Sequence, residues 1–175
     1  MLRLLVLSGL LLAASAASSA QIGPAVPDEV VTWTATVAPP RTAAEWTDTF
    51  APGEQAYVTV TARVRPGWRV YALDSPGGLP LQFHLDALPD GLAPEGAVGH
   101  TPPRDAYDPV LEEAYRYYAG EARLWQAVRL APGLADGPRE VTGAIRFAAC
   151  NDEVCLPPRE VPFRARLTVR AASAP

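Results

Sequence analysis

The stretch AYVTVTARV, residues 56–64, alternates apolar and polar side chains without interruption. A period of two residues is typical of a β-strand that has one face in the core and one face toward water. The same alternation occurs in VVTWTATV (30–37), LQFHL (81–85) and VPFRARLTV (161–169). Because no segment after residue 20 shows a sustained helical period, the chain predicts a domain built from strands.

Shorter extended segments and frequent turns complete this pattern. Further strand-like segments cover residues 68–71, 115–118, 122–130 and 141–147, and pairs such as Pro-Gly and Asp-Gly separate them. Roughly seven or eight short strands with such turns predict an all-β, immunoglobulin-like antiparallel β-sandwich. Two cysteines that bracket a tryptophan, as in antibody domains, are absent, so we expect no inter-sheet disulfide of that kind.

The region from residue 89 to residue 109 is rich in proline, glycine and aspartate and shows no sustained period. We expect it to be a long connection between strands. Long connections in compact domains are usually functional or mobile.

The N-terminus predicts export. Arg3 precedes an apolar run over residues 4–14, and Ser18 and Ala20 fit a signal-peptidase site before Gln21. This run is shorter than the roughly 20 residues that span a bilayer as a helix, and nothing later in the chain is longer. We therefore expect a soluble periplasmic protein with no direct membrane insertion.

The expected domain organisation has four parts. These are a signal peptide (1–20), a flexible lead-in (21–27), one β-sandwich domain (28–170) and a disordered tail (171–175). The chain has a formal net charge of −4. This charge argues against nucleic acid and anionic membrane surfaces as partners.

The segment CNDEVCLPP, residues 150–158, holds both cysteines of the chain. It lies between two strand-like runs, and Asn151 and Asp152 are turn formers. Pro157 and Pro158 cannot donate ladder hydrogen bonds, so regular pairing should stop near Cys155. The sequence therefore predicts a cysteine pair at an irregular end of a sheet.

The spacing of this pair leaves two interpretations open. A bridge across about six residues stabilises a fold by only roughly 2 kcal/mol in the chain-entropy model, and a domain of this size can fold without one. An exposed loop on a rigid sandwich often carries function, so a redox pair is equally compatible with the spacing. The rival is a non-catalytic envelope binding module whose disulfide is structural.

A metal site is a weaker interpretation of the same cysteines. Asp152 and Glu153 lie between them, but His84 and His100 are distant in sequence and lack ligand spacing. We expect no metal and no cofactor. The two acids should disfavour a thiolate, and Arg146 and Arg159 are candidates to offset them.

The segment ACNDEVCLPP (149–158) resembles the active-site signature of the N-terminal periplasmic domain of the thiol:disulfide interchange protein DsbD. PGWRVY (66–71), followed by PGG (76–78), resembles an early strand and loop of that domain. YDPVL (107–111) and YYAGE (117–121) resemble its cap loop and the strand after it. These matches fall in the family's order and extend over about residues 28–170.

The resemblance implies a protein-disulfide reductase component with an immunoglobulin-like fold. Electron pairs would pass through a Cys150–Cys155 disulfide, with Cys155 forming the mixed disulfide and Cys150 resolving it. The implied electron donor is a thioredoxin-like periplasmic protein fed by a membrane electron transporter on a separate chain. The implied acceptors are exported disulfide-containing proteins, either disulfide isomerases or cytochrome c maturation factors.

The resemblance also implies residues around the cysteines. Leu111 occupies the position nearest to the family's shielding phenylalanine, and Glu112 follows where glycine is common. The expected cap loop and active-site surround consist of Tyr107, Asp108, Leu111, Tyr117 and Pro157. Tyr115 and Tyr118 are further candidates to line the cysteine pocket.

Overall fold

A computed structural model describes residues 27–39, 47–109 and 112–170 of the 175-residue chain. Four parts of the chain for which the sequence made predictions lie outside these ranges: the signal peptide (1–20), residues 21–26 of the lead-in, the tail (171–175) and Leu111. Within the described ranges, no helix is both long and apolar enough to cross a membrane.

The elements are almost all strands. In chain order they are α1 (Pro27–Val30), β1 (Val31–Ala38), β2 (Thr49–Phe50), β3 (Gln55–Val64), β4 (Arg69–Tyr71), β5 (Gln82–Leu85), β6 (Leu92–His100), β7 (Arg104–Asp108), β8 (Glu113–Tyr118), β9 (Glu121–Leu130), β10 (Gly137–Phe147), β11 (Ala149–Cys150) and β12 (Arg159–Val169).

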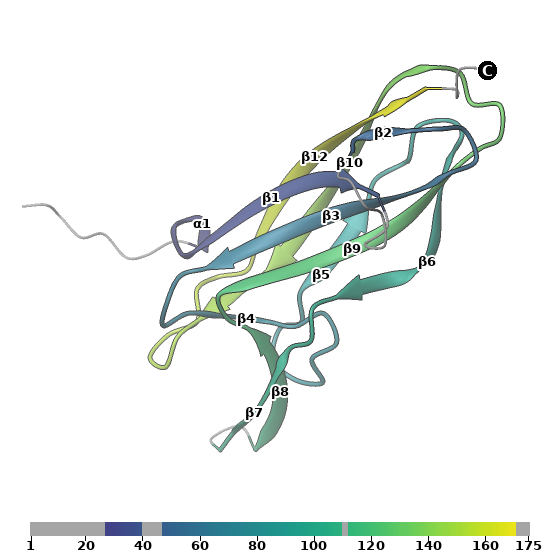
Figure 1. The fold of residues 1–175 in the computed structure, drawn as a ribbon. Helices are drawn as coiled ribbons and strands as arrows, with labels where there is room; N and C mark the ends of the chain where they lie inside the picture. The colour runs from purple at the N-terminus through teal and green to yellow at the C-terminus, as the bar shows by residue number, and fades with distance from the viewer. Residues whose placement is uncertain (1–26, 40–46, 110–111, 171–175) are drawn as a thin grey trace, which may run out of the picture.

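These strands form three four-stranded sheets. Sheet A has the order β1-β3-β9-β6, sheet B the order β2-β12-β10-β5, and sheet C the order β11-β4-β8-β7. Pairing is antiparallel except between β12 and β2. Sheets A and B face each other, and β7 and β8 of sheet C project from one end (Figure 1). The predicted all-β, immunoglobulin-like antiparallel sandwich is confirmed.

The core follows the alternation that the sequence showed. In β3, every second residue from Ala56 to Val64 is at most 5% exposed, and the residues between them are half-buried or exposed. Leu124 and Leu130 of β9 are fully buried, and so is Leu167 of β12 at 1% exposure. Burying each such leucine stabilises the fold by roughly 1.5–3 kcal/mol relative to an exposed side chain.

The expectation of a long connection over residues 89–109 is wrong, because this region contains β6 and β7. β6 lies at the edge of sheet A, and its pairing with β9 shifts register between Glu95 and Gly99. Proline is tolerated on an edge strand because its missing N–H can face away from the sheet. Pro94 and this irregularity removed the period that would have revealed the strand.

The pairing of β10 with β12 places the cysteine segment. It runs without interruption from Gly137 opposite Val169 to Phe147 opposite Arg159. Residues 148–158 then leave sheet B together, at the end of the sandwich opposite the C-terminal end of β12 (Figure 1). There, β11 pairs with β4 and joins sheet C.

We predict that Gly143→Ala destabilises the sandwich. A Cβ at this position of β10 would overlap the backbone oxygen of His84 in β5 and the ring of Phe163 in β12. Overpacking of this kind typically costs about 1–3 kcal/mol. Urea unfolding of the variant measures the loss, with the half-buried neighbour Thr142→Ala as control. Equal stability of Gly143→Ala and the wild type would contradict the close approach of β5 to β10.

Candidate functional site

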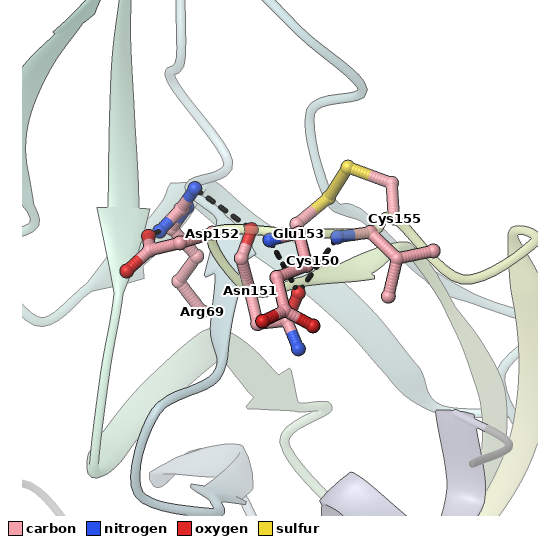
Figure 2. The surroundings of a disulfide bond; sticks show 7 residues. Arg69, Cys150, Asn151, Asp152, Glu153 and Cys155 are labelled. Atoms are coloured by element: carbon pink, nitrogen blue, oxygen red, sulfur yellow. Dashed lines mark hydrogen bonds and ion pairs between the residues drawn. A yellow bond between two sulfur atoms is a disulfide. The ribbon is translucent and has the colours of Figure 1, made fainter. Parts of the chain in front are cut away.

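The two cysteines form a disulfide. Cys150 and Cys155 are bonded, with their Cα atoms 4.0 Å apart. Cys150 ends β11, and Cys155 faces it in an isolated antiparallel bridge. The disulfide therefore closes a small hairpin that projects beyond the pairing of β10 with β12 (Figure 2).

The hairpin is also held by hydrogen bonds that do not involve sulfur. The backbone N–H of Asn151 donates to the carbonyl of Val154 at 2.9 Å, and that of Leu156 donates to Ala149 at 2.8 Å. The side-chain Oδ1 of Asn151 accepts from the N–H groups of Glu153 at 2.9 Å and Val154 at 2.7 Å. Asn151 thus forms the turn that its residue type predicted.

Arg69 of β4 holds this hairpin from the side. It lies directly opposite Cys150 in the register of β4 and β11. Its Nη1 donates to Oδ1 of Asp152 at 2.7 Å, and its Nη2 donates to the carbonyl of Asn151 at 3.0 Å (Figure 2). The guanidinium carbon also lies 5.9 Å from the centre of the Tyr115 ring. Arg69 is a cation beside the loop in addition to the two that we considered, Arg146 and Arg159.

The charge state of Arg69 follows from these contacts. Burial is the largest single effect and lowers its pKa, but the hydrogen bond to Asp152 and the negative charges of Asp152, Tyr115 and Tyr71 together outweigh burial, so the pKa is raised. Arg69 is therefore always a cation at neutral pH. Its side chain is 27% exposed, whereas that of Asp152 is 93% exposed.

The two halves of the disulfide differ in exposure. Cys150 is 1% exposed, while Cys155 is an exposed residue. Val154, just before Cys155, is 49% exposed, and Pro157 just after the buried Leu156 is exposed. A protein that approaches this end of the sandwich therefore meets Cys155 and its neighbours first, and Cys150 only through them.

Three tyrosines lie on the face of sheet C that carries Arg69. The rings of Tyr71 and Tyr115 are 5.5 Å apart, and those of Tyr115 and Tyr117 are 5.9 Å apart. Side chains alternate between the two faces of a strand, so Tyr118 points to the opposite face. There it is 4% exposed, and burial raises its pKa to about 12. Tyr117 thus belongs to the tyrosine cluster beside the loop, whereas Tyr118 belongs to the core.

The predicted cap-loop residues Tyr107 and Asp108 lie on opposite faces of sheet C. Asp108 lies opposite Glu113 at the end of the β7–β8 hairpin. The pKa of Tyr71 is raised mainly by burial and by Tyr115, and the carboxylates of Asp108 and Glu113 raise it further. Asp108 is therefore near the tyrosine cluster. Tyr107 lies opposite Ala114, on the other face of sheet C, and is 60% exposed.

Two strands, β4 and β8, separate Tyr107 from β11. The structure therefore does not bring Tyr107 together with the cysteines. The role of Leu111 as a shield lies outside the described residues and stays a prediction. Glu112, next to it, has a positive φ of 52°, a conformation that favours glycine.

Within the described part of the chain, no group of three or more histidine, cysteine, aspartate or glutamate side chains is arranged to hold a metal ion. His84 lies 3.9 Å from Asp86, and Nδ1 of His100 lies 2.9 Å from the hydroxyl of Tyr118.

Comparisons with known proteins find likenesses among solved structures. No protein-family model and no curated protein match the sequence. The fold is similar to the N-terminal domain of Neisseria meningitidis DsbD in the reduced form, with 18% identity, a TM-score of 0.46, and coverage of 84% of this chain and 94% of that chain. This is the kind of domain whose cysteine signature the loop resembles.

Two further structures are more distant. The N-terminal periplasmic domain of ScsB from Proteus mirabilis is 14% identical, with a TM-score of 0.42 over 82% of this chain and 49% of that chain. A family 123 glycoside hydrolase from Clostridium perfringens is 10% identical, with a TM-score of 0.33 over 82% of this chain and 28% of that chain. Likenesses at this level concern the fold and say nothing about the chemistry of the site.

We predict that opening the disulfide changes stability little. The loop keeps the hydrogen bonds of Asn151 and the contacts of Arg69 without it, so reduction should lower the free energy of unfolding by no more than about 2 kcal/mol. Urea unfolding with and without a reductant measures this difference. The double variant Cys150→Ala, Cys155→Ala, which has no thiols, controls for the reductant. A loss of about 4 kcal/mol or more would identify the disulfide as a structural bridge.

Proposed function

We propose that this chain is a thiol–disulfide exchange domain that passes electron pairs through Cys150 and Cys155. The observation that carries the proposal is the exposure of the disulfide, which joins an exposed Cys155 to a Cys150 that is 1% exposed. Exchange requires a thiolate to reach one sulfur of the disulfide. A loop that offers one cysteine and encloses the other directs this attack to Cys155.

The reaction follows from this asymmetry. A donor thiolate attacks Sγ of Cys155, the bond to Cys150 breaks, and Cys150 leaves as a thiolate that takes up a proton. The second thiol of the donor then attacks the mixed disulfide, so that the donor is oxidised and both cysteines are reduced. In the opposite half-reaction, the thiolate of Cys155 attacks an acceptor disulfide, and Cys150 displaces the reduced acceptor.

The partners of this reaction are proposed from the resemblance of the cysteine segment to the DsbD N-terminal domain. The donor would be a thioredoxin-like periplasmic protein that receives electrons from a membrane transporter. The acceptors would be exported proteins, either disulfide isomerases or cytochrome c maturation factors. The periplasm is the compartment in which such exchange takes place and in which disulfides persist.

The loop's own hydrogen bonds count against the rival function, a binding module with a permanent bridge. They already connect Asn151 to Val154 and Ala149 to Leu156. A disulfide across the same few residues adds little to the order of the loop. Because Cys155 is exposed, a permanent bridge at this position would also be unprotected from thiol–disulfide exchange.

We expect the reduction potential of the Cys150–Cys155 pair to lie in the range of exchange proteins, roughly −120 to −270 mV. Equilibration of the protein in glutathione buffers of known ratio, followed by alkylation of free thiols and mass spectrometry, measures it. Structural disulfides lie below about −300 mV. A value in that lower range would reject the proposed function and support the binding module.

We also predict that the two single-cysteine variants differ in trapping. Cys150→Ser leaves the exposed Cys155 without its resolving partner, so mixed disulfides with exported thiol–disulfide proteins should accumulate. Cys155→Ser keeps only the buried Cys150 and serves as the matched control, with at least about tenfold less mixed disulfide, because attack depends on access. Non-reducing electrophoresis and mass spectrometry identify the species. Equal trapping by both variants would contradict the assigned roles.

A further inference from the structure

Arg69 connects the cysteine loop to a strand outside it. The bonds formed by Asn151 and Ala149 join residues within the loop itself, whereas Arg69 comes from β4, which is 82 residues away from Asn151 in sequence. Val70 beside it is 1% exposed and anchors β4 in the core. Arg69 therefore connects the hairpin turn of the loop to a strand that is anchored in the core.

The two contacts of Arg69 differ in strength. Asp152 is 93% exposed, so its ion pair with Arg69 is screened by water. Exposed pairs change an equilibrium by only about one- to fivefold. The bond from Nη2 to the carbonyl of Asn151 is a charge-assisted hydrogen bond to the backbone, and such bonds correspond to roughly tenfold or more. The carbonyl contact is therefore the stronger of the two.

We propose that Arg69 is a positioning residue for the exchange reaction and acts through the carbonyl of Asn151. It fixes the residue that follows Cys150, so that the thiolate of Cys150 stays within reach of Cys155 after the disulfide has opened. This inference rests on the proposed function and adds a residue that controls its second step.

The step that Arg69 assists is the closing of the disulfide. The thiolate of Cys150 attacks Sγ of Cys155 in the mixed disulfide, a bond between the two cysteines forms, and the bond to the partner breaks. The partner leaves as a thiolate and takes up a proton, so that the partner is reduced by two electrons and the cysteine pair is oxidised. Fixing the loop raises the effective concentration of one thiol at the other, which favours this step.

The Asp152 carboxylate limits a purely electrostatic role. It lies 2.7 Å from Nη1 of Arg69 and balances the positive charge beside the loop. Stabilisation of the Cys150 thiolate by Arg69 is correspondingly reduced. The geometric effect of the bond to the carbonyl of Asn151 then dominates.

The test is the effective concentration of the two thiols, measured by equilibrating each variant in glutathione and in dithiothreitol buffers. We expect Arg69→Gln to lower it roughly tenfold relative to the wild type. Tenfold corresponds to a potential about 30 mV less negative. Arg69→Lys, which has no guanidinium fork, should recover part of the loss, and Asp152→Asn should stay within about twofold of the wild type. Arg164→Gln, which removes an exposed arginine on β12 paired with Glu140, is the matched control and should change nothing.

Kinetics separate positioning from general damage to the fold. With oxidised glutathione as the probe, the rate of attack by reduced Cys155 should be the same in Arg69→Gln and in the wild type. The release of glutathione by Cys150 from the mixed disulfide should be roughly tenfold slower in the variant. Circular dichroism checks that the sandwich is intact. If Arg69→Gln does not fold, the same comparison is made with Arg69→Lys, for which an intermediate slowing is expected.

Two results would overturn this inference. Wild-type effective concentration and release rate in Arg69→Gln would show that Arg69 does not position the loop. A loss in Asp152→Asn as large as that in Arg69→Gln would show that the ion pair, and not the carbonyl bond, is responsible. A wild-type potential in the range of structural disulfides, together with a clear difference between the variants, would count against the proposed function alone.

Discussion

The continuous antiparallel pairing of β10 with β12 is the constraint on which the cysteine site depends. Because the two strands pair along their whole lengths, residues 148–158 have to leave the sheet together at a single end. Phe147, Ala148 and Ala149, at the base of the segment, are at most 2% exposed. Cys150 follows them and is enclosed, while Cys155 lies beyond the turn and reaches solvent. The difference between the two cysteines is thus a property of the sandwich around them.

Much of the fold could be predicted from side-chain alternation alone. Strands with one buried and one exposed face, such as β3 and β12, show the period of two because the core selects every second residue. β6 was missed because Pro94 and the register shift near Gly99 break this period at a sheet edge. Sheet C was missed as a unit because β11 and β4 are only two and three residues long. Two or three residues are too few to show an alternation of buried and exposed side chains.

The site was predictable where it depends on neighbours in sequence, and unpredictable where it depends on register. The cysteine pair and the turn at Asn151 follow from residue types within one short segment. The contact between Arg69 and Asp152 joins residues 83 positions apart. It depends on which residue of β4 lies opposite Cys150, and no local rule gives that register. The placement of Tyr107 on the other face of sheet C depends in the same way on its pairing with Ala114.

The irregular strand β6 has a consequence for how this domain meets other proteins. An open sheet edge offers unpaired N–H and C=O groups to any extended chain, and uncontrolled strand addition leads to aggregation. Along β6, Pro94 offers no N–H, and the shift between Glu95 and Gly99 interrupts a straight edge. This edge of sheet A is therefore a poor template for a foreign strand. The domain is therefore protected at this edge from backbone pairing with the extended segments of other proteins.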